Sequence, residues 1–89
     1  MSDKELPKEW ALRWIAGSIV SFLKGRTPLN ILLGRIKKSI KHYGVSIDEI
    51  FGIIRSIGEN PIYISMLNSE DVATKLELLT SSLRRFEGG

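Results

Sequence analysis

The sequence predicts an all-α fold, a compact bundle of four main helices and one short helix. Apolar residues recur at intervals of three and four in four separate stretches, and Ser, Pro or Gly residues separate these stretches. No pair of alternating segments offers two strands that could form a sheet. With 89 residues and no cysteine, the chain is close to the size at which one hydrophobic core suffices without disulfides. We expect a flexible segment at residues 1–7 and one helical domain over residues 8–87.

The first predicted helix covers residues 8–24 and is apolar on two sides. Its core stripe has helical spacing and comprises Leu12, Ile15, Ala16, Ile19, Phe22 and Leu23. The opposite side carries a second strip, made of Trp10, Trp14, Gly17 and Ser21 and flanked by Arg13 and Lys24. Two interpretations of this strip follow: the C-terminal helix folds back over the tryptophans, or another molecule binds them.

Residues 27–44 combine the clearest helix pattern with the strongest charge asymmetry. The core side comprises Leu29, Leu32, Leu33, Ile36, Ile40 and Tyr43. The remaining circumference carries Arg35, Lys37, Lys38 and Lys41, together with Asn30, Gly34 and His42. Thr27 can cap this helix, Pro28 suits its first position, and Gly44 can adopt the left-handed conformation that ends it. The pattern predicts a helix with one cationic face.

Two further main helices and a short one complete the prediction. Ser46 and Glu49 form a Ser-x-x-Glu capping box at the start of a helix that Gly58 ends, with Ile47, Ile50, Phe51, Ile54 and Ile57 facing inward. Residues 59–68 alternate as a strand would, but we favour a helical turn begun by Asn60 and Pro61, since no second strand is available. The last helix runs from residue 68 or 69 to 86, with Val72, Leu76, Leu79, Leu83 and Phe86 facing inward.

The net charge of +3 conceals a division between the two halves of the chain. Residues 10–47 contain seven basic residues and no carboxylate, whereas residues 48–89 contain seven acidic and four basic residues. Such asymmetry either attracts two halves of one fold or indicates an anionic partner. The cysteine-free composition, rich in Ile, Lys, Glu and Arg, suits a cytoplasmic protein from a thermophile. We predict neither a signal peptide nor a membrane-spanning helix.

Catalytic and cofactor motifs are missing from the sequence. Its single histidine, His42, follows a run of lysines and suits a surface role. The adjacent carboxylates Asp48 and Glu49, like Glu70 and Asp71, point in different directions along a helix. No phosphate-binding glycine loop is present. We therefore expect no enzymatic activity, no cofactor and no metal site.

Residues 39–54 resemble a helix-turn-helix in which a Gly-Val-Ser turn precedes a recognition helix. Ile40 occupies a position where that motif uses a small residue. The helix that would enter the groove opens with Asp48 and Glu49, which repel phosphates, and continues with Phe51 and Gly52 rather than base-reading side chains. We interpret the match as tight packing of two helices rather than as sequence-specific DNA recognition.

Taken whole, this cysteine-free, Ile- and Lys-rich helical chain with a basic first half resembles the small accessory subunits of crenarchaeal B-family DNA polymerases. The resemblance implies an archaeal protein that stabilises or modulates a DNA-replication polymerase and has no chemistry of its own.

The predicted function is non-catalytic protein binding. The docking residues are Trp10, Arg13, Trp14, Gly17 and Ser21. The alternative is autonomous, sequence-independent nucleic-acid binding through Lys24, Arg26, Arg35, Lys37, Lys38 and Lys41. A homodimer closed through the tryptophans is a further interpretation. A membrane-surface role for residues 8–24 ranks lower, because their apolar stripe is needed in the core.

Overall fold

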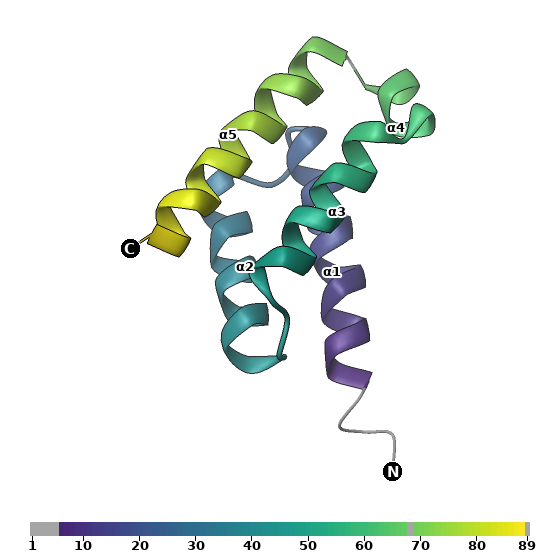
Figure 1. Cartoon of the computed structure of the whole chain (residues 1–89). Helices are drawn as coiled ribbons and strands as arrows, with labels where there is room; N and C mark the ends of the chain where they lie inside the picture. The colour runs from purple at the N-terminus through teal and green to yellow at the C-terminus, as the bar shows by residue number, and fades with distance from the viewer. Residues whose placement is uncertain (1–5, 68, 89) are drawn as a thin grey trace.

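Five helices make up the described part of the chain (Figure 1). A computed structural model describes residues 6–67 and 69–88. The helices are α1 (Leu6–Leu23), α2 (Leu29–His42), α3 (Ile47–Glu59), α4 (Pro61–Met66) and α5 (Ser69–Gly88). No strand occurs within these residues. The prediction of an all-α bundle with four main helices and one short helix is confirmed.

The longest-range contacts converge on α1. Helices α2 and α3 both pack along it, and α5 packs against α3 and reaches the C-terminal end of α1 (Figure 1). There the Lys75 ammonium donates a hydrogen bond to the Leu23 carbonyl oxygen at 3.2 Å. Among the described residues one buried apolar cluster joins these elements, comprising Ala11, Ile15, Ile19, Phe22, Leu23, Leu32, Ile36, Val45, Ile50, Ile54, Ile57, Val72, Leu79 and Leu83.

The turn between α1 and α2 differs from the predicted capping. Gly25 adopts φ +79°, and the next amide, that of Arg26, donates to the Ser21 carbonyl at 2.9 Å, so a left-handed glycine ends α1. Thr27 does not cap α2: its hydroxyl donates to Ser21 Oγ at 2.8 Å, and the N-cap residue is Pro28. Thr27 therefore lies one position before the N-cap, and its hydroxyl bonds Ser21 across the turn instead.

The other predicted boundaries of α1 and α2 fall close to the observed ones. Helix α1 begins at Leu6, two residues earlier than predicted, and Gly44 adopts the predicted left-handed conformation with φ +72°. The predicted flexible segment, residues 1–7, lies mostly outside the described residues.

Helix α3 begins as predicted and ends one residue later than predicted. The Glu49 amide donates to Ser46 Oγ at 3.1 Å, and the Ser46 amide donates to Glu49 Oε1 at 3.0 Å, which confirms the capping box. Gly58 does not stop the helix, which continues to Glu59. A Cβ atom at Gly58 would lie 3.2 Å from Leu76 Cδ1, so this glycine allows α5 to approach α3 closely.

The favoured helical turn after α3 is present as α4. The Asn60 side-chain oxygen accepts a hydrogen bond from the Ile62 amide at 2.9 Å, with Pro61 at the first helical position. On α5 the inward residues Val72, Leu79 and Leu83 are buried. The predicted inward position of Phe86 lies outside the described side chains.

The predicted tight packing of the helix-turn-helix-like segment is wrong. Helices α2 and α3 each pack against α1 and make few contacts with each other, whereas the two helices of that motif pack together. Ile40 is half-buried, and Val45 of the turn is almost fully buried in the core. The turn therefore attaches both helices to α1 rather than to each other.

Candidate docking surface

The predicted docking strip on α1 divides between open surface and contact with α2. Trp10 is 54% exposed, and Arg13 and Gly17 are exposed as well. Trp14 and Ser21 are half-buried because they face α2. The predicted residues thus do not form one continuous exposed strip.

Trp10, Trp14 and Tyr43 form an aromatic cluster. The two indoles stack with ring centroids 5.2 Å apart and planes inclined by 22°. Tyr43, at the C-terminal end of α2, meets Trp10 edge-on at 5.8 Å and Trp14 edge-on at 6.5 Å. Offset-stacked and edge-to-face pairs are the favourable aromatic arrangements. Cover for Trp14 comes from α2 rather than from the C-terminal helix, and Trp10 keeps more than half of its surface open.

Arg35 joins α2 to α1 beside this cluster. Its Nη1 donates a hydrogen bond to Ser18 Oγ at 3.1 Å, and its guanidinium carbon lies 6.0 Å from the centroid of the Trp14 ring. Ser18 is only 4% exposed, so Arg35 supplies the hydrogen-bond donor that this buried hydroxyl oxygen needs. The second contact is a cation–π interaction. Arg35 is thus a fixed charge at the edge of the aromatic cluster.

The other predicted nucleic-acid-binding residues are exposed but do not form one patch. Lys24 and Arg26 lie at the turn between α1 and α2, whereas Lys37, Lys38 and Lys41 lie on the second half of α2. Helix α2 has 14 residues, so its two ends lie about 21 Å apart.

The cations of α2 are arranged in two neighbouring strips. Arg35 and Lys38 are three residues apart and share the side of α2 that faces Trp14, whereas Lys37 and Lys41 share the next strip. In the part of the chain that the structure describes, no carboxylate lies within ion-pair distance of Lys38 or Lys41. At these two residues the charge asymmetry is therefore not balanced by acids from the later half.

The open surface between α1 and α2 forms what we call the α1–α2 seam, made of Trp10, Gly17, Ile31, Arg35 and Lys38. Contacts between the helices run in opposite order, with Tyr43 beside Trp10 and Thr27 beside Ser21, so the helices are antiparallel. Ile31, four residues before Arg35, is 45% exposed. A Cβ atom at Gly17 would meet nothing within 4 Å, so the middle of the seam is open.

The sequence indicates neither Ile31 as part of the seam nor Tyr43 as the support of Trp10. Tyr43 continues the apolar stripe of α2, and that pattern predicts a core residue. A usable signal was the short turn at residues 24–28: it makes the helices antiparallel, which brings the end of the second helix beside the start of the first.

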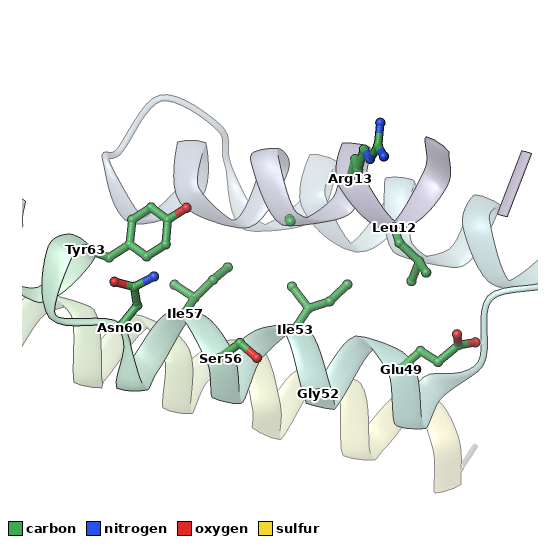
Figure 2. A pocket seen from close by; sticks show the side chains of 10 residues that line it. Leu12, Arg13, Glu49, Gly52, Ile53, Ser56, Ile57, Asn60 and Tyr63 are labelled. Atoms are coloured by element: carbon green, nitrogen blue, oxygen red, sulfur yellow. The ribbon is translucent and has the colours of Figure 1, made fainter. Parts of the chain in front are cut away.

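A separate groove of about 630 Å³ lies between α1 and α3 (Figure 2). Figure 2 shows Leu12 pointing toward α3, and Ile53 and Ile57 pointing toward α1, while Tyr63 closes one end. Arg13 stands at the rim and points away from α3. The structure thus assigns Arg13 to the edge of this groove rather than to the aromatic cluster.

Glu49 stands at the end of the groove opposite Tyr63 (Figure 2). Its Oε1 lies 3.2 Å from the Lys8 ammonium, an ion pair that links α3 to α1. The hydrogen bond from the Ser46 backbone amide, and then the Lys8 ammonium, hold the pKa of Glu49 below its usual value of 4.5. Glu49 is therefore a structural carboxylate, ionised at neutral pH.

The described residues do not assemble reactive groups. No three His, Asp or Glu side chains among them gather as metal ligands would, and their buried side-chain polar atoms all have hydrogen-bond partners. None of the described helices is both long and apolar enough to cross a bilayer. Comparisons with protein families, with curated proteins and with solved structures found no match to this chain.

Proposed function

We propose that this protein is a non-catalytic binding module that docks onto a larger protein through the α1–α2 seam. The observation that carries the proposal is Trp10, which is more than half exposed although Trp14 and Tyr43 hold it in place. Tryptophan, tyrosine and arginine are the residues enriched at the centres of protein interfaces. Because the rings are already ordered, binding loses little side-chain entropy.

The energy available at Trp10 is large for one side chain. A tryptophan presents about 150–250 Å² of surface, so with 54% exposed roughly 100 Å² remains for a partner to cover. At about 25 cal/mol per Å² this burial is worth about 2.5 kcal/mol before the costs of association. A contribution of that size is typical of a hot spot. The resemblance to polymerase accessory subunits suggests that the partner is a nucleic-acid-processing enzyme, specifically a DNA polymerase.

Site-specific photocrosslinking in the source organism tests this proposal. A benzophenone amino acid placed at Lys38, on the seam, should capture a discrete partner, and Trp10→Ala should abolish the capture. The same crosslinker at Arg55, an exposed residue of α3, serves as the matched control and should capture nothing specific. Capture that is equal at both positions, or that survives Trp10→Ala in a folded variant, contradicts docking through the seam.

A second candidate function, sequence-independent nucleic-acid binding, is favoured by one observation. Lys38 and Lys41 are exposed, and among the described residues no carboxylate pairs with them. With only a few phosphate contacts, binding should be weak and should fall steeply as salt rises. Titration with duplex and single-stranded DNA at several salt concentrations should show this fall, and charge reversal at Lys37, Lys38 and Lys41 should abolish binding. An absence of measurable binding at low salt rejects this candidate.

A further inference from the structure

The shape of the α1–α2 seam limits what can cover it, given the docking function proposed above. The two exposed apolar residues of the seam are Trp10 and Ile31. Tyr43 contacts Trp10 and lies 12 residues after Ile31 at the end of α2. At 1.5 Å per residue, Trp10 and Ile31 therefore stand about 18 Å apart along the seam. Gly17 leaves the surface between them open. The seam is therefore long, shallow and apolar at both ends.

The secondary structure of the seam favours a helical occupant. An extended peptide binds most readily by adding a strand to a sheet edge, and the described part of the chain contains no strand. An α-helix satisfies its own backbone hydrogen bonds and needs only side-chain contacts. Side chains at positions i and i+11 of a helix lie about 17 Å apart on one face, which matches the separation of Trp10 and Ile31.

The charge of the seam favours an acidic occupant. Arg35 uses Nη1 on Ser18, and no described residue accepts a hydrogen bond from its other guanidinium nitrogens. Lys38 is exposed, and within the described residues neither cation has a carboxylate partner. A second copy of this chain, seated seam on seam, would bring the same cationic surface of both copies together, since a two-fold contact uses one patch on each subunit. Complementarity thus selects a different, negatively charged segment.

We propose that the segment covering the α1–α2 seam is an acidic amphipathic helix of the partner protein. Its apolar side chains, about 11 residues apart, cover Trp10 and Ile31. Its carboxylates meet Arg35 and Lys38. The partner backbone passes over Gly17.

Selection from a peptide library tests the proposal. A displayed library of random peptides about 18 residues long is selected on the full-length protein and counter-selected on its Trp10→Ala variant. Enriched peptides should contain Asp and Glu together with apolar residues at helical spacing, and a synthetic peptide of that sequence should gain helicity by circular dichroism on binding. Enriched peptides that are neutral or basic, or whose apolar residues lack helical spacing, contradict the proposal.

Variants then locate the peptide and separate its contacts. Trp10→Ala and Lys38→Glu should each weaken the selected peptide by about tenfold or more in calorimetric titration, whereas Arg55→Glu should leave its affinity unchanged. Affinity that is insensitive to Lys38→Glu overturns the acidic helix.

Two competing occupants give distinct results. If oligothymidylate displaces the peptide and binds the seam more tightly than the peptide does, the occupant is nucleic acid. If sedimentation shows a dimer that Trp10→Ala dissociates, the occupant is a second copy. Either result overturns the inference.

The two experiments distinguish a failure of the proposed docking function from a failure of the proposed acidic helix. Trp10-dependent crosslinking in cells without acidic helical winners would retain the docking function and remove the acidic helix. Loss of the crosslink as well would remove both.

Discussion

The two sides of α1 are built from different chemistry. Toward α3 the lining is mainly aliphatic: Leu12 faces Ile53 and Ile57 across the groove (Figure 2). Toward α2 the buried aliphatic side chains Leu32 and Ile36 are joined by aromatic and polar contacts, made by Trp14 and by the Arg35–Ser18 hydrogen bond. Aliphatic burial is non-directional and scales with area, whereas stacking and hydrogen bonding need defined geometry. Aliphatic burial is thus common to both sides of α1, and the directional contacts give the α2 side a defined surface.

The largest expected effect contrasts Ile15 with Trp10. Ile15 is fully buried, so Ile15→Ala should lower the free energy of unfolding by about 3 kcal/mol through lost burial and the cavity that it leaves. Trp10→Ala should cost about 1 kcal/mol, mainly its stacking on Trp14. Urea denaturation monitored by circular dichroism measures both values. Equal losses would break the comparison, because Trp10 would then be part of the core.

Arg35 tests whether the α2 side depends on directional contacts. Arg35→Ala removes the donor to the buried Ser18 hydroxyl and the cation over Trp14, so it should cost about 1–2 kcal/mol. Lys38→Ala, on the same strip of α2, should change stability by less than about 0.5 kcal/mol. The same denaturation experiment compares the pair. Matching values would mean that the Arg35 contacts add nothing to the fold.

Gly17 separates stability from docking. An added Cβ meets nothing within 4 Å, so Gly17→Ala should stabilise α1 by about 0.5–1 kcal/mol through the better helix propensity of alanine. Larger residues, as in Gly17→Leu, should weaken binding of the selected acidic peptide because they occupy the open centre of the seam. Gly52→Ala and Gly52→Leu are the matched controls on α3, since Gly52 is also unobstructed but lies on a helix that takes no part in the seam. Peptide affinity that is unchanged in Gly17→Leu would move the occupant away from Gly17.

The smallest expected effect is the loss of the stabilising contribution of Glu49, on the α3 side of α1, at low pH. The folded-state pKa of Glu49 is lowered, so its stabilising contribution is complete above its ordinary pKa of 4.5 and is lost as pH falls through the lowered value. The melting temperature of the native protein should exceed that of Glu49→Gln at about pH 6, and the difference should disappear once the pH falls below the lowered pKa of Glu49. A difference that persists in acid would show that the carboxylate charge is not what links Lys8 to α3.

The helix ends that were predicted correctly from the sequence are those fixed by local capping. Ser46 and Glu49 satisfy each other within one turn, so no distant residue can change the outcome. The Thr27 prediction is wrong because Pro28 occupies the N-cap position, and the Thr27 hydroxyl bonds Ser21 across the turn instead. Gly58 failed because Leu76 of α5 approaches it closely, a requirement that helix propensity does not contain. Errors therefore fall where a non-local contact competes with a local rule.

The same limit applies to the candidate site. Helical periodicity places Trp10 and Trp14 on one strip, but it does not separate the exposed ring from the half-buried one. The separation depends on Tyr43 and Arg35, which the path of α2 brings alongside. Arg13, next to Trp14 in sequence, stands instead at the rim of the α1–α3 groove. Helical spacing predicts which residues lie near the surface of α1, and the packing of α2 decides which of them form one cluster.

The convergence of the bundle on its first helix has a consequence for biosynthesis. Leu23, at the end of α1, leaves the ribosome early, whereas the α5 residues of its core cluster end at Leu83, 60 residues later. At about 5–20 residues per second, this end of α1 waits about 3–12 s for its cover from α5. Nascent chains halted at residue 67 should therefore be sensitive to protease and bind chaperones, whereas released full-length chains should resist both.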